Sequence, residues 1–121
     1  MAGILEALRS GLPPDAVLID PDVVEPYRQD RAMFCPPGHP VAVVRARSTA
    51  DVQHVLRTAS AYDTPVVPQG ARSGLSGAAN ASEGCIVLSM ERMDRIIEVD
   101  RANRLVVVEP GVFNATLSHA V

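Results

Sequence analysis

Residues 65–80 read PVVPQGARSGLSGAAN. A short β-branched run between two prolines begins this stretch, and it predicts a strand over residues 64–68. A loop rich in Gly, Ala and Ser follows over residues 69–82. Small residues let backbone N–H groups approach a ligand closely, and successive N–H groups in a turn bind anions. The pattern favours a diphosphate-binding loop, although a plain surface loop stays open as the alternative.

The candidate ligand-binding segment contains ten residues. The hydroxyls of Ser73 and Ser76 can bind phosphate oxygens, and Arg72 is the segment's single cation. The glycines are spaced G-x-x-x-G-x-x-G, which is not the G-x-G-x-x-G of a Rossmann turn. All eleven basic residues are Arg, so a Walker A lysine and a Schiff-base lysine are excluded within this chain. The segment consists of Gly70, Ala71, Arg72, Ser73, Gly74, Leu75, Ser76, Gly77, Ala78 and Ala79.

Regular structure is predicted on both sides of this loop. Residues 41–44 form an apolar β-branched run, and Ser48 precedes Asp51 by three positions, as at the start of a helix. That helix has an apolar face made by Val52, Val55, Leu56 and Ala59, so strand, helix and strand form a βαβ unit. Residues 85–88 predict a third strand, and residues 95–99 and 105–109 predict a hairpin.

The two ends of the chain differ from this pattern. Ile4, Leu5 and Leu8 predict a short helix, and five prolines between residues 21 and 40 exclude a long helix or a central strand. We therefore divide the chain into a covering arm, residues 1–40, and an ordered part, residues 41–121. At the other end Asn114 is expected to cap a last helix. Because the chain stops within that helix, we expect a truncated piece of a larger protein.

Composition removes several classes of function. The chain has 121 residues and a formal net charge of −3, which argues against nucleic acid as its main partner. No apolar run approaches the roughly 20 residues of a transmembrane helix. Cys35 and Cys85 are expected to be free thiols and small core residues in a reducing cytoplasm, and His54 a solvated helix residue. No spacing of Cys or His suggests a metal site.

The run 65–80 resembles the signature of FAD-linked oxidases of the PCMH (vanillyl-alcohol oxidase) type. Within that type it is most similar to the branch of the glycolate oxidase D-subunit and D-lactate dehydrogenase. Four further segments agree in order, and the resemblance covers residues 20–121. They are Tyr27 with Asp30; 43–52, with Val43-Val44-Arg45, Ser48-Thr49 and Val52; 88–96, with Leu88-Ser89 and Met93 to Ile96; and Val108 to Val112.

The resemblance implies an α+β fold, namely the first subdomain of a PCMH-type FAD-binding domain: a βαβ unit plus hairpin strands, truncated. It implies a flavoprotein oxidoreductase in which residues 70–79 wrap the FAD pyrophosphate and the Pro110-Gly111 turn lies close to the cofactor. A 2-hydroxy acid of the glycolate or D-lactate type would give a hydride to FAD, and an electron acceptor would reoxidise it. A second FAD subdomain and a substrate cap are expected in the rest of the enzyme.

Two features separate this chain from that pattern. Arg72 stands where a small or neutral residue is usual, and three alternatives stay open for it: a pair with the diphosphate, a pair with a nearby carboxylate, or a side chain that points to solvent. Ala78 and Ala79 stand where Gly is common. Tyr27, Tyr62 and His119 are interpreted as packing or surface residues, so no catalytic residue is assigned, and the isolated chain is expected to be inactive. The alternative from another class is a non-enzymatic remnant that associates, with a partner or with itself, through an exposed apolar face. A nucleotide-binding module unrelated to flavin fits the order of motifs poorly.

Overall fold

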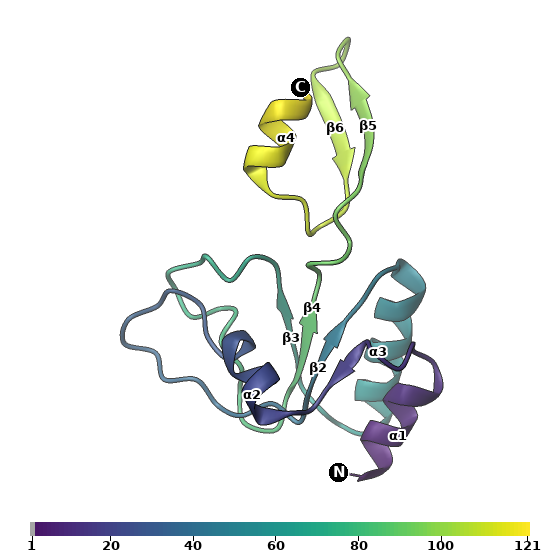
Figure 1. Cartoon of the computed structure of the whole chain (residues 1–121), viewed down its shortest axis with the longest axis vertical. Helices are drawn as coiled ribbons and strands as arrows, with labels where there is room; N and C mark the ends of the chain where they lie inside the picture. The colour runs from purple at the N-terminus through teal and green to yellow at the C-terminus, as the bar shows by residue number, and fades with distance from the viewer. Residues whose placement is uncertain (1) are drawn as a thin grey trace.

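The structure is a computed structural model that describes residues 2–121. A body built on a four-stranded sheet carries a smaller lobe made of a hairpin and the last helix (Figure 1). This mixed architecture confirms the expected fold class. The elements are α1 (Ala2–Ser10), β1 (Val17–Leu18), α2 (Pro21–Val24), the 3-10 helix η1 (Glu25–Tyr27), β2 (Ala42–Arg45), α3 (Thr49–Ala61), β3 (Val66–Gln69), β4 (Ile86–Ser89), β5 (Ile96–Asp100), β6 (Leu105–Val108) and α4 (Asn114–Ala120).

The sheet has the strand order β1-β2-β4-β3. Strands β2, β4 and β3 are parallel, and β1 pairs with β2 in the antiparallel sense. The predicted βαβ unit is therefore present, but β4 lies between its two strands. Arg45, Ser89 and Gln69 occupy equivalent positions across these three strands. Because the strands are parallel, these three residues form a polar row at the carboxyl edge of the sheet.

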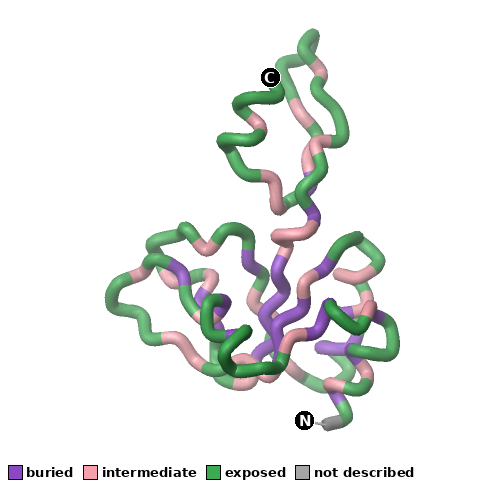
Figure 2. Tube along the Cα trace, viewed as in Figure 1, coloured by how far each residue is buried: buried purple, intermediate pink, exposed green. Residues whose placement is uncertain are grey.

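Both faces of the sheet are covered (Figure 2). Helices α1 and α3 pack side by side on one face, where Val44, Ile86 and Leu88 belong to the larger apolar cluster. On the other face Val43 and Val87 pack against the residues that follow β1, with Tyr27 among them. Alternate side chains of a strand point to opposite faces, so the two clusters follow from the continuous apolar runs in the sequence.

The first forty residues contribute to the body itself. The predicted N-terminal helix is present as α1. Strand β1 was not predicted, because a two-residue strand forms only through its pairing with β2. Nor were α2 and η1, which tolerate prolines because Pro21 and Pro26 stand in their first turns. His54 is not a solvated residue. Its Nε2 lies 3.0 Å from the carbonyl oxygen of Ala7, at the end of α1.

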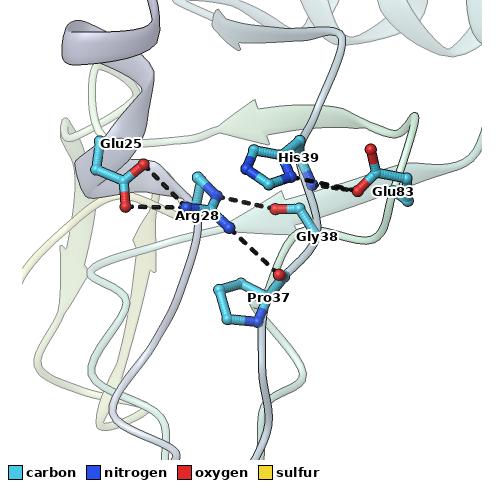
Figure 3. Close-up of polar contacts among 6 residues, drawn as sticks. All are labelled: Glu25, Arg28, Pro37, Gly38, His39 and Glu83. Atoms are coloured by element: carbon cyan, nitrogen blue, oxygen red, sulfur yellow. Dashed lines mark hydrogen bonds and ion pairs between the residues drawn. The ribbon is translucent and has the colours of Figure 1, made fainter.

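Arg28 fixes the proline-rich segment that follows η1 (Figure 3). Its Nε donates to the carbonyl oxygen of Gly38 at 3.0 Å, and Nη2 donates to that of Pro37 at 3.3 Å. Nη1 donates to both carboxylate oxygens of Glu25. One guanidinium thus joins three points of the arm and holds an otherwise irregular segment in one path.

Two details of the helices correct the sequence analysis. Ser48 caps α3 as predicted, since its hydroxyl accepts from the N–H of Asp51 at 3.2 Å. Leu56, however, is 48% exposed and lies outside the buried face of that helix. Asn114 is the first residue of α4 and not its cap. Phe113 occupies the N-cap position, with no hydrogen bond from its side chain.

Strands β5 and β6 form the predicted antiparallel hairpin, with a bulge between Ile96 and Glu98. The hairpin and α4 leave apolar side chains in solvent. The exposed apolar residues of this lobe include Ile97, Leu105, Val107 and Phe113.

The two cysteines differ from one another. Cys85 is buried as expected, and burial raises the pKa of its thiol, but Cys35 is exposed.

Candidate functional site

Residues 70–85 connect two parallel neighbours, β3 and β4, without a helix or a strand. Parallel strands need a long crossover, which is usually helical, and a helix uses its own N–H groups internally. Here no backbone N–H from residue 71 to residue 78 donates a hydrogen bond to any residue in 2–121. The loop predicted from the sequence therefore presents eight successive N–H groups that a ligand can use.

The far end of the loop is tied to the segment 27–35, which runs beside it (Figure 1). Asp30 is buried, and its carboxylate accepts from the N–H groups of Ala32 and Ala79. Asn80 accepts from the N–H of Asp30 at 2.7 Å and donates to the carbonyl oxygen of Cys35 at 2.7 Å. Asp30 and Asn80 both lie in segments that carry the resemblance, but the contacts of Asn80 had no local signal because its partners lie 45 and 50 positions away.

Gln69 closes the base of the loop. It is only 2% exposed, and its Nε2 donates to the carbonyl oxygens of Tyr27 and, at 2.8 Å, of Ala79. Its Oε1 is buried without a hydrogen-bond partner among the described residues, and so is Nε of Arg45 in the same polar row. A buried polar atom without a partner costs free energy, so both atoms mark this edge as a place where a further polar group fits.

The loop glycines serve different purposes. A Cβ at Gly70 would meet nothing within 4 Å, which leaves open space beside the backbone for a ligand. A Cβ at Gly77 would lie 2.7 Å from Sγ of Cys35, and the φ angle there is +81°. Gly77 is thus required by the packing of the chain, whereas the structure gives Gly70 no packing role.

Arg72 projects from the loop onto an aromatic ring. Its guanidinium carbon lies 4.5 Å from the centre of the Tyr27 ring, and the phenol of Tyr27 donates to Oε1 of Glu91. The same oxygen of Glu91 lies 3.7 Å from Nη1 of Arg45. Burial and the hydrogen bond to Glu91 raise the pKa of Tyr27 above its usual range, so the ring stays a neutral phenol. The packing role expected for Tyr27 is confirmed, and the ring also supports a cation.

The Pro110-Gly111 turn lies next to the start of the glycine loop. The N–H of Met90 donates to the carbonyl oxygen of Gln69 at 2.9 Å. On its other side, the carbonyl oxygen of Met90 would lie 2.1 Å from a Cβ at Gly111, and the N–H of Gly111 donates to Met93 at 2.7 Å. Met90 thus contacts both Gln69, the residue before the glycine loop, and Gly111 of the turn.

Glu109 joins the two ends of the hairpin next to this turn. Its carboxylate accepts from the backbone N–H of Arg95 at 2.8 Å and from the Arg95 guanidinium at 2.9 and 3.1 Å. These hydrogen bonds lower the pKa of Glu109 and raise that of Arg95.

Tyr62 is half-exposed and His119 is exposed, as surface residues should be. Residues 2–121 contain no group of three metal-ligating side chains and no helix that could cross a membrane.

Comparison with known proteins agrees with this geometry. The family described as FAD binding domain matches residues 40–121. This chain belongs to that family. The FAD-binding domain is 36% identical over 114 residues to D-2-hydroxyglutarate dehydrogenase of Stutzerimonas stutzeri, which covers 94% of the chain and 24% of that enzyme. It is 32% identical to glycolate oxidase subunit GlcD of Escherichia coli K12, over 98% of the chain and 23% of that subunit.

Solved structures show the same fold. The FAD-binding domain superposes on 4-ethylphenol oxidase of Gulosibacter chungangensis with a TM-score of 0.88 at 27% identity, over 99% of this chain and 24% of that one. For p-cresol methylhydroxylase the TM-score is 0.85 at 25% identity, over 98% and 24%. The chain thus spans about a quarter of the length of the proteins it matches.

Proposed function

We propose that residues 70–79 and the Pro110-Gly111 turn hold FAD, with the backbone N–H groups of the loop bound to its diphosphate. One observation carries this proposal: eight successive N–H groups, from residue 71 to residue 78, are unused in a loop whose two ends are fixed. The hydroxyls of Ser73 and Ser76 add donors to the same loop, and the open side of Gly70 gives the ligand room.

We further propose that the whole protein oxidises a 2-hydroxy acid. The matched relatives include D-2-hydroxyglutarate dehydrogenase, D-lactate dehydrogenase of Anaerostipes hadrus and glycolate oxidase subunits. FAD, when bound, supplies the hydride acceptor. The residues of this chain bind and orient it, while the general base, the substrate pocket and the site of the electron acceptor lie in the rest of the enzyme. The isolated chain is therefore inactive.

A second candidate function rests on the exposed apolar residues of the hairpin lobe. Val107 and Leu105 are 42% and 47% exposed, and Phe113 is 61% exposed. Such a surface is suited to association with another polypeptide. Sedimentation of the chain over a range of concentrations tests this role. A monomer at every concentration would remove the support for self-association through this surface.

The FAD site can be tested by amide NMR, which detects weak binding and locates it. Titration of the chain with FAD should shift the amide signals of residues 71–78 in a saturable way. Gly70→Asp should weaken binding, because a carboxylate beside a diphosphate is repulsive. Gly70→Asn is the matched control, since it fills the same space without charge. Signals that shift only elsewhere, or equal binding by the two variants, would refute the proposed site.

A further inference from the structure

Arg72 is an unusual residue for its place in the loop. Its φ angle is +56°, in the left-handed region that side chains rarely adopt. The guanidinium makes no ion pair and no hydrogen bond with any residue of the described chain. An arginine without a carboxylate partner, held within a loop of free N–H groups, keeps its full charge and all five donors for a ligand.

The Tyr27 ring beneath Arg72 is held from two sides. The phenol donates to Glu91, and the backbone carbonyl of Tyr27 accepts from the buried Gln69. The residue itself is only 8% exposed. A ring held at its hydroxyl and at its backbone is a rigid support, so the cation stacked on it loses little additional freedom when it binds a ligand.

The nearby carboxylates are already engaged. Glu91 accepts from the phenol of Tyr27 and faces Arg45. Asp30 accepts from two backbone N–H groups. Neither carboxylate neutralises Arg72. The guanidinium lies over the Tyr27 ring, and its N–H donors, which are not used within the described chain, can bind phosphate oxygens in a bidentate manner.

We propose that the side chain of Arg72 binds the diphosphate of FAD, and that Tyr27 is the positioning residue that aims it through the stacked ring. This inference rests on the proposed function and adds a charged contact to a site otherwise made of backbone N–H groups and hydroxyls. Affinity for FAD should consequently depend on the diphosphate charge and on salt, because screening weakens an ionic contact more than a neutral one.

The test measures the affinity of the chain for FAD, ADP and riboflavin by amide NMR titration. Arg72→Gln should weaken FAD and ADP binding by about tenfold to a hundredfold and reduce their salt dependence, with no effect on riboflavin. The matched control is Arg57→Gln, which removes the same charge from an exposed position on α3. If the loop signals respond to FAD but the two variants bind FAD with equal affinity, the role of Arg72 is refuted and the FAD site is not. A wild-type loop that does not respond would overturn the FAD site as well.

The role of Tyr27 needs variants that separate the ring from its hydroxyl. Tyr27→Phe keeps the stacked ring, so it should retain most of the affinity for FAD and all of the salt dependence. Tyr27→Leu removes the ring, and its effect on FAD should not add to that of Arg72→Gln if the two residues act as a unit. Additive effects, or a Tyr27→Phe chain that loses the salt dependence, would refute the positioning role.

Discussion

Gly111 lies where the hairpin lobe joins the body, and the structure predicts that it cannot be replaced. In Gly111→Ala, the new Cβ would lie 2.1 Å from the carbonyl oxygen of Met90 and 2.8 Å from that of Met93. Ordinary contacts begin near 3.4 Å, so the backbone must move by about 1 Å. That movement strains the packing and weakens the 2.7 Å hydrogen bond from Gly111 to Met93. Together these effects should cost about 3 kcal/mol of unfolding free energy.

The assay is urea and thermal unfolding followed by far-ultraviolet circular dichroism. A loss of about 3 kcal/mol lowers the melting temperature of a chain of this size by about 10 °C. Gly70→Ala is the control, because its Cβ would meet nothing within 4 Å and should change stability by less than about 0.5 kcal/mol. Equal midpoints for the two variants would refute the packing argument. A loss of FAD binding by Gly111→Ala at unchanged stability would assign Gly111 to the cofactor instead.

Two further predictions concern polar contacts that hold segments together. The hydrogen bonds from Arg95 lower the pKa of Glu109 in the folded chain. This contact therefore stabilises the chain fully at a pH above the pKa of an unfolded glutamate, about 4.3. The stabilisation is lost as the pH falls through the lower pKa of the folded state. The difference in stability between wild type and Glu109→Gln should thus shrink in urea unfolding below about pH 4, whereas Glu98→Gln, at an exposed position of β5, should show no such change. His54→Ala should lower the free energy of unfolding by about 1 kcal/mol and expose α1 to proteolysis, because it removes the contact with the α1 carbonyls. His119→Ala, the control, should leave stability unchanged. Equal protease resistance of the two histidine variants would contradict the role of His54.

The sequence allowed strands β2 to β6 to be predicted to within one or two residues, because each of them depends on a local run of apolar side chains. Residues 85–88, for example, became Ile86–Ser89 in the structure. The order of the strands could not be predicted in this way. Nothing local to β4 shows that it lies between β2 and β3, since this placement follows from packing on both faces.

The candidate loop was located by its composition, but the contacts that hold it could not be predicted. Gln69, Asp30 and Asn80 act through contacts between positions as far as 50 residues apart. A single sequence carries no periodic signal for such contacts. His54 shows the same limit, because its assignment to solvent was reasonable from the helix pattern alone, and only the packing of α1 corrects it.

The connection between β3 and β4 affects both the folding and the stability of the chain. An irregular segment that returns along the full length of a strand has to be closed before β4 can occupy the centre of the sheet, and closing residues 70–85 costs on the order of 2 kcal/mol of chain entropy beyond a constant. A ligand that orders this segment shares that cost. A ligand that binds only the native state stabilises that state in proportion to the logarithm of the ligand concentration. A ligand bound to the loop should therefore slow hydrogen exchange of the buried amides of β4. FAD bound to the loop would then stabilise the central strand of the sheet, although it does not pack against that strand.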